Sequence, residues 1–145
     1  MPVSYRIDIT AALVLSRGRG VVTGAELVAH ARALAADPRF HPALHQVFDL
    51  RDATRGEVDR ATILQLASLS PFGQGARRAI VVPGDLAYGL SRMFEILRDP
   101  LPDEIRVCRS LTEACAWLGL SHETPWEAAA QRPPDWSIGD DRPSA

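Results

Sequence analysis

The fold of this chain is indicated most directly by residues 46–54, which read QVFDLRDAT. Val47, Phe48 and Leu50 form a short apolar run that is typical of a buried strand. Charged and hydroxyl-bearing residues follow at once, over 51–54. In an open α/β sheet, ligands bind in the loops that follow the carboxyl ends of the strands. The stretch therefore predicts a central strand and a candidate site directly after it.

The N-terminal segment before this strand has a strand pattern of its own. Apolar and polar residues alternate over 4–10, and residues 11–15 are apolar throughout. These two runs predict either a hairpin or one bent strand. The sequence Arg17-Gly18-Arg19-Gly20 is expected to end the second run.

The rest of the chain alternates between helix and strand patterns. Capping boxes at Thr23–Glu26 and Ser110–Glu113 indicate two helix starts, and Asp85 is expected to cap a third helix. Further strands are expected over 79–82 and 105–107, and helices over 24–36, 58–69, 86–97 and 111–118.

This order of elements predicts an α/β fold with a mostly parallel sheet of four or five strands and about four helices. We expect one domain over residues 1–120, followed by a Pro-, Asp- and Arg-rich tail over 121–145. The tail is expected to be either loosely ordered or docked on the domain by Trp126 or Trp136.

Composition excludes several classes of function. The chain has 145 residues and a formal net charge of -2, which does not favour a nucleic-acid partner. It contains no Lys, so Schiff-base chemistry and a phosphate-loop lysine are excluded. It also contains no Asn, so it has no acceptor for N-glycosylation. No stretch is apolar enough to span a membrane, and no signal peptide is recognised, so we expect a cytoplasmic protein. A homodimer remains possible.

The cysteines and histidines show no pattern of a metal site. Cys108 and Cys115 are too few for a disulfide framework and are expected to be buried free thiols. The four histidines lack the spacing of metal ligands, and neither cysteine completes a set with them. We therefore expect neither a metal nor a cofactor.

The carboxyl ends of the expected strands bring a set of polar residues to one rim of the sheet. Helix N-termini would favour an anion there, with arginines adding contacts to a carboxylate or phosphate. The alternative is that these side chains form surface ion pairs and helix caps, or that Tyr88 packs at the edge of the core. The candidate ligand-binding residues are Arg51, Asp52, Thr54, Gly84, Asp85, Tyr88, Arg109 and Ser110.

Asp49 lies inside the expected strand, so a buried carboxylate is predicted to need a partner. Arg78 on the neighbouring strand and a backbone amide at the next helix start are the candidates. We favour structural pairing of Asp49 over a role as a general base.

Five stretches of the chain together carry a resemblance to a known family. They are Ala36-Asp37-Pro38-Arg39-Phe40, Phe48-Asp49-Leu50-Arg51, Arg78-Ala79-Ile80-Val81-Val82-Pro83, Ala87-Tyr88-Gly89-Leu90-Ser91-Arg92-Met93-Phe94 and Ala114-Cys115-Ala116-Trp117-Leu118-Gly119. These stretches resemble the bacterial SpoIIAA-like proteins, which are described as STAS/SEC14-like domains and are mostly uncharacterised. The resemblance covers about residues 4–120 and implies an α/β sandwich.

In the STAS relatives that act as anti-sigma factor antagonists, a helix begins with a phosphorylated serine in an Asp-Ser-Ser-Gly-like motif. The matching stretch of this chain is Asp59-Arg60-Ala61-Thr62, which lacks that serine. Only Thr54 or Thr62 could take its place, so the resemblance does not carry the phosphoserine switch to this chain.

The sequence leaves three functions open. We expect a non-enzymatic regulatory or interaction module that binds a small apolar or anionic ligand or a protein partner. The first alternative is a phosphorylation-controlled partner switch that uses Thr54 or Thr62. The second alternative is a small enzyme with Asp49, Asp52 or Cys108 at its centre.

Overall fold

The computed structural model describes residues 3–85, 88–89, 91–92, 95 and 103–120. Eight elements have defined bounds. In chain order they are β1 (Val3–Asp8), β2 (Leu13–Thr23), α1 (Gly24–Ala36), β3 (His45–Glu57), α2 (Arg60–Leu69), β4 (Arg77–Val81), β5 (Glu104–Cys108) and α4 (Leu111–Leu118).

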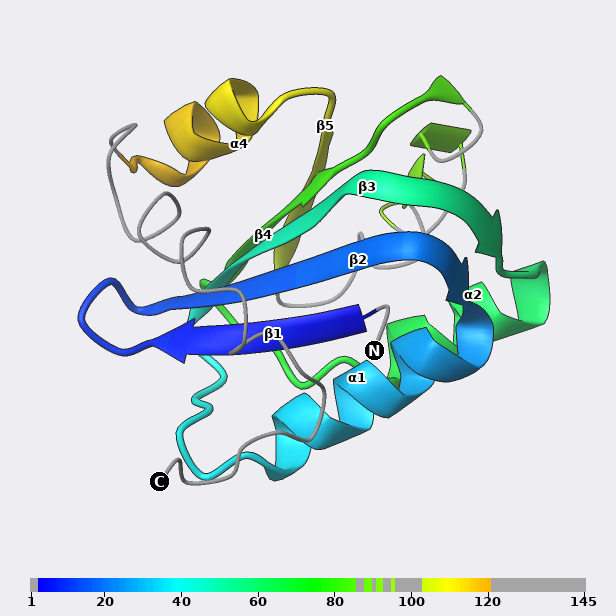
Figure 1. Cartoon of the computed structure of the whole chain (residues 1–145). Coiled ribbons are helices and arrows are strands. Elements are labelled where there is room, and N and C mark those ends of the chain that lie inside the picture. Colours follow the sequence, from blue (N-terminus) through cyan, green and yellow to red (C-terminus); the bar gives the residue numbers. More distant parts are fainter. Residues whose placement is uncertain (1–2, 86–87, 90, 93–94, 96–102, 121–145) are drawn as a thin grey trace.

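The five strands form one sheet in the order β1-β2-β3-β4-β5 (Figure 1). β1 pairs antiparallel with β2, and each of the other three pairings is parallel. The predicted α/β fold with a mostly parallel sheet is therefore confirmed, with five strands. The first two strands form a hairpin, whose turn includes Ala12 at a φ of 54°.

Three helices have defined bounds, so the expectation of about four helices is not confirmed. The helix expected over 86–97 lies largely outside the described residues. The tail over 121–145, with Trp126 and Trp136, lies outside them entirely.

Two strands are longer than the sequence predicted. The Arg17–Gly20 stretch does not end β2, because the strand continues to Thr23 with register shifts after Arg17 and after Gly20. β3 likewise continues to Glu57 along β2. The prediction of a loop over 51–54 is therefore wrong. This outer half of β3 is mostly exposed, so it lacks the apolar pattern that reveals a strand.

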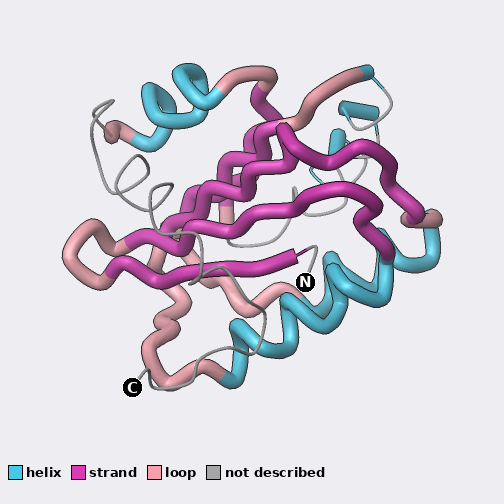
Figure 2. The backbone as a smooth tube through the Cα atoms, viewed as in Figure 1, coloured by secondary structure: helices cyan, strands magenta, loops and turns pink. Residues whose placement is uncertain are grey.

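The sheet separates two apolar layers. Figures 1 and 2 show α1 and α2 on one face of the sheet and α4 on the other. Alternate strand residues divide between the faces, as the pleat of a strand requires. The α4 side has a core of Leu13, Leu15, Val47, Ala79, Val81, Cys108 and Ala114. On the opposite face the core contains Val3, Val22, Phe48, Ile63, Ala67, Ile80, Val82 and Val107.

The helix starts follow the sequence closely. Thr23 accepts a hydrogen bond from the Glu26 amide, and the Glu26 carboxylate accepts one from the Thr23 amide, which confirms the first capping box. At α4, Ser110 accepts from the Glu113 amide at 3.1 Å, while Glu113 accepts from the amide of Arg109. The second capping box therefore differs by one residue, because the Glu113 carboxylate binds the amide of Arg109 and not that of Ser110.

α1 and α2 meet closely where α1 begins. A Cβ atom added to Gly24 would lie 2.7 Å from Cγ2 of Thr62. Asp59 caps α2 by accepting a hydrogen bond from the Thr62 amide at 2.8 Å. The small residue at Gly24 thus lets the two helix starts approach on the same face of the sheet.

The segment after α1 is held by one buried carboxylate. Asp37 receives two hydrogen bonds from the Arg39 guanidinium, at 3.0 and 2.7 Å, and one from the Tyr5 hydroxyl at 2.7 Å. The Asp37 side chain is fully buried, whereas that of Arg39 is 45% exposed. The hydrogen bonds from the Arg39 side chain are the main cause that lowers the pKa of Asp37 from 3.8 to about 2.

The pKa of Asp37 is lower in the folded state than in the unfolded state. The ionised carboxylate therefore stabilises the fold above about pH 4, and this stabilisation is lost as pH falls toward 2. We expect the free energy of unfolding of the wild type to fall by about 2 kcal/mol more than that of Asp37→Asn over this range. Urea unfolding at a series of pH values would measure this. Parallel pH profiles of the two proteins would contradict it.

Candidate functional site

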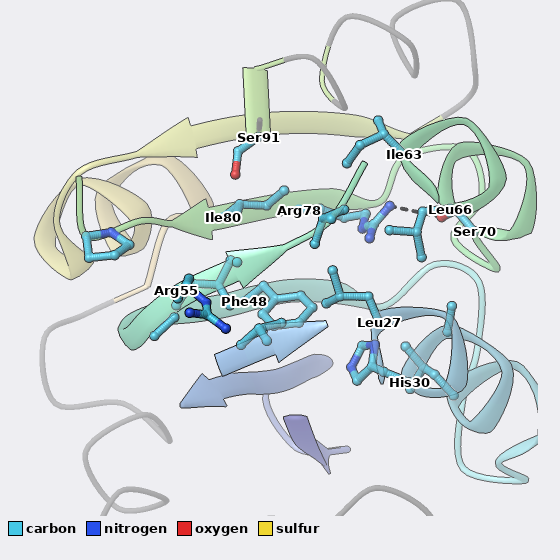
Figure 3. A pocket seen from close by; sticks show the side chains of 18 of the residues that line it. Leu27, His30, Phe48, Arg55, Ile63, Leu66, Ser70, Arg78, Ile80 and Ser91 are labelled. Carbon is cyan, nitrogen blue, oxygen red and sulfur yellow. Dashed lines mark hydrogen bonds between the residues drawn. The ribbon is translucent and has the colours of Figure 1, made fainter. Parts of the chain in front are cut away.

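A cavity of about 450 Å³ lies between the sheet and the helices α1 and α2. Its floor comes from the strands, with Phe48 of β3 and Ile80 of β4, as Figure 3 shows. Leu27 of α1 and Leu66 of α2 form parts of its walls. Its other apolar lining residues include Val22, Ala31, Leu34, Leu50, Ala53, Val58, Ile63, Phe72 and Pro83.

Neighbouring strands beside this cavity differ in length. β4 pairs with β3 only from Gln46 to Asp49, whereas β3 continues along β2 as far as Glu57. The outer part of β3 therefore extends beyond β4. Thr54, Arg55, Asp85 and Ser91 contribute polar groups to the lining, and Arg55 pairs with Glu57.

A buried chain of hydrogen bonds crosses the sheet beside the cavity. Arg78 donates from Nε to Oε1 of Gln46 at 2.9 Å, and Gln46 donates from Nε2 to Oγ of Ser16 at 3.0 Å. The Ser16 hydroxyl lies 2.8 Å from Nε2 of His30. All four side chains belong to residues that are less than one-tenth exposed. Of them, His30 and Arg78 line the cavity.

Arg78 is the charged end of this chain. Its Nη1 donates to Oγ of Ser70 at 2.9 Å and to Oδ2 of Asp103 at 3.2 Å. Its guanidinium carbon also lies 4.5 Å from the centre of the Phe72 ring. Asp103 is itself 4% exposed, so the buried positive charge has a buried counter-charge beside it.

His30 is neutral in this setting. Burial, together with the positive charge of Arg78, lowers the pKa of His30 from 6.5 to about 3. The ring packs between Phe48, with ring centres 5.0 Å apart, and Tyr5, at 5.6 Å. An uncharged imidazole therefore stands in the cavity wall near neutral pH.

Asp49 and Arg51 pair with each other. Arg51 donates to the Asp49 carboxylate from its backbone amide, from Nε and from Nη2, each at 2.9 Å. The prediction that Arg78 pairs with Asp49 is wrong, and the backbone amide that Asp49 binds is not at a helix start. The hydrogen bonds that the Arg51 guanidinium donates to the Asp49 carboxylate raise the pKa of Arg51. Residues i and i+2 of a strand share a face, which makes this pairing local.

Of the predicted ligand-binding residues, Thr54, Gly84 and Asp85 line the cavity. The remaining five lie outside its lining. Asp52 pairs with Arg17 at 3.1 Å, and Ser110 caps α4. Arg109 donates to Asp85 at 3.0 Å, and its guanidinium carbon lies 4.2 Å from the centre of the Tyr88 ring. Of the predicted residues outside the lining, Arg109 is therefore joined to the cavity edge through Asp85, whereas Asp52 is held by Arg17.

The two threonines proposed as phosphorylation sites differ in their surroundings. Thr54 is exposed and lines the cavity. Thr62 is partly buried, and its side chain lies against Gly24 at the start of α1. A phosphate on Thr62 would therefore have to part α1 from α2.

Neither the cavity nor the buried histidine in its wall was predicted from the sequence. His30 lies three residues after Leu27 and four before Leu34, on the apolar face of α1. That spacing could have placed His30 toward the sheet. No local pattern signals Ser16 or Gln46, because their contacts with His30 and Arg78 join residues 14 and 32 positions apart.

The described residues contain no group of three or more His, Cys, Asp or Glu side chains that could hold a metal ion. Cys108 and Cys115 are buried and form no disulfide within the part of the chain that the structure describes, as predicted. None of the described helices has the length and hydropathy needed to cross a bilayer.

Comparison with known proteins gives a match in structure alone. No family model and no curated protein matches the chain. The chain is similar to the crystal structure of an uncharacterized protein of the DUF3478 family, with a SpoIIAA-like fold, from Shewanella loihica PV-4. The identity is 17%, the TM-score is 0.49, and the match covers 80% of this chain and 91% of the other. The fold named for that protein is the one that the sequence resemblance implied.

Cys108 is a poor candidate for a nucleophile. Its residue has no exposed surface, and burial raises the pKa of its thiol to about 11. We expect alkylation of Cys108 by iodoacetamide at pH 8 to be at least about 100-fold slower in the native protein than in urea. Peptide mapping by mass spectrometry would measure both rates. Fast labelling of the native protein would instead restore Cys108 as a candidate catalytic residue.

Proposed function

We propose that this protein is a non-enzymatic module that binds a small apolar molecule in the cavity between the sheet and helices α1 and α2. The observation that supports this most strongly is the cavity itself, with its lining of Phe48, Leu27, Leu66 and Ile80 among other apolar side chains. Its volume of about 450 Å³ lies within the range of small-molecule sites.

The hydrophobic effect supplies the driving force for such binding. Transfer of apolar surface out of water gains about 25 cal/mol per Å². A ligand that buries ~200 Å² of apolar surface in the cavity would thus gain about 5 kcal/mol before the costs of association.

An anionic ligand is less well supported than an apolar one. Arg51 and Arg109 were the residues expected to hold an anion, and they pair with Asp49 and Asp85. An anion would have to compete with these carboxylates for the same guanidinium groups. Asp49 is likewise occupied by Arg51, which removes support for its use as a general base.

A module of this kind would act by presenting a different surface to a protein partner when its cavity is filled. The cavity edge at Thr54, Arg55 and Asp85 lies partly at the molecular surface, where such a change could be recognised. The exposure of these residues supports the edge of the cavity as the surface for the proposed regulatory role.

The proposal is tested with N-phenyl-1-naphthylamine, an uncharged probe whose fluorescence rises in apolar surroundings. Ala31 lines the cavity, so Ala31→Trp should fill part of it and weaken probe binding at least about tenfold. Fluorescence titration would give the dissociation constants.

Ala35→Trp provides the matched control. Ala35 is on the same helix but is exposed and does not line the cavity, so this variant should bind the probe like the wild type. Equal binding by Ala31→Trp and the wild type, or no binding by the wild type, would contradict the proposed function. Circular dichroism would verify that both variants keep the wild-type content of helix and strand.

A further inference from the structure

Two buried polar side chains, His30 and Arg78, line the cavity, and His30 is the uncharged one. It belongs to α1 and is 4% exposed, and Figure 3 shows its ring directed from the helix toward the strands. Its Nε2 is within hydrogen-bond distance of Ser16. The state of the other ring nitrogen, Nδ1, decides what the cavity can recognise.

The hydrogen-bond chain sets the direction of each bond. Arg78 can only donate, so the atom of Gln46 that faces it must be the carbonyl oxygen Oε1. The amide nitrogen of Gln46 then donates to the Ser16 hydroxyl. Ser16 is fully buried, so its own proton needs an acceptor, and Nε2 of His30 provides one. A neutral imidazole that accepts at Nε2 carries its proton on Nδ1.

The Nδ1 atom of His30 has no hydrogen-bond partner among the described residues. Among the described residues, the side-chain N and O atoms that are fully buried and lack a partner are Arg6 Nη1 and Arg17 Nε. Nδ1 of His30 is not one of them. His30 lines the cavity, so its Nδ1–H group is a donor available to a bound molecule. A hydrogen bond to this donor would offset the cost of burying one acceptor of a ligand.

We infer that the cavity binds an uncharged apolar molecule with one hydrogen-bond acceptor, such as a ketone, ester or ether oxygen, which accepts from Nδ1–H of His30. This inference rests on the proposed function and adds the class of ligand to it. Ser16, Gln46 and Arg78 act as positioning residues, because they hold the imidazole in one tautomer.

The charges around the cavity favour an uncharged acceptor over a carboxylate. The charge of Arg78 is compensated by Asp103, at 3.2 Å. Arg55 pairs with Glu57, so its charge is also shared. A carboxylate beside His30 would lose its hydration and gain a single neutral donor in return, which is unfavourable.

Three probes of similar shape test this inference. Diphenylmethane is apolar, benzophenone adds one carbonyl acceptor, and diphenylacetate adds a carboxylate. We expect His30→Phe to lower the preference for benzophenone over diphenylmethane about tenfold, because it removes the donor and keeps an apolar ring. Dissociation constants would come from competition with N-phenyl-1-naphthylamine.

His41→Phe is the matched control, because it makes the same substitution at an exposed histidine that does not line the cavity. It should leave the preference for benzophenone unchanged. An unchanged preference in His30→Phe, or tighter binding of diphenylacetate than of benzophenone by the wild type, would overturn the inference while leaving apolar binding intact. Failure of both neutral probes to bind the wild type would contradict the proposed function itself.

A measurement on the wild type covers the case in which His30→Phe does not fold. Nitrogen-15 NMR of the imidazole distinguishes a protonated ring nitrogen from an unprotonated one. We expect His30 to remain neutral from pH 5 to pH 8, with its proton on Nδ1. A proton on Nε2, or on both nitrogens, would overturn the inference.

Discussion

The parallel pairing of β2 with β3 is the constraint on which the other features of this protein depend. It extends from the pair Leu13–His45 to the pair Thr23–Glu57, through two register shifts. The inner half of this ladder holds Phe48 and Ser16 beneath α1, while the outer half extends β3 beyond β4. The part of β3 beyond β4 contributes Ala53, Thr54, Arg55 and Gly56 to the lining of the cavity.

A polar chain built into an apolar layer is expensive unless its groups are paired, since buried polar groups without partners lose their hydration. In this protein the chain runs from Asp103 through Arg78, Gln46 and Ser16 to His30, and each link has a hydrogen-bond partner. It ends in the cavity wall, so its last donor is where a ligand would be recognised.

Two exposed arginines each pair with a buried aspartate that lies two positions earlier in the chain. In Asp37-Pro38-Arg39 and Asp49-Leu50-Arg51, the arginine donates to the aspartate from its backbone amide, from Nε and from Nη2. Both carboxylates are buried and both guanidinium groups are partly exposed. Such a pair satisfies a buried charge with a residue two positions away, which explains why no distant arginine is needed.

The sequence by itself determined the α/β class, the mostly parallel sheet, the start of α1 and the burial of both cysteines, because hydrophobic period and capping residues act over a few positions. It did not determine where β2 and β3 end, since their outer halves are held by pairing with each other rather than by burial. The tertiary structure alone decided that His30 meets Ser16 and that Gln46 meets Arg78 beside a cavity. The length of each strand and the choice among several possible partners depend on distances that only the folded chain sets.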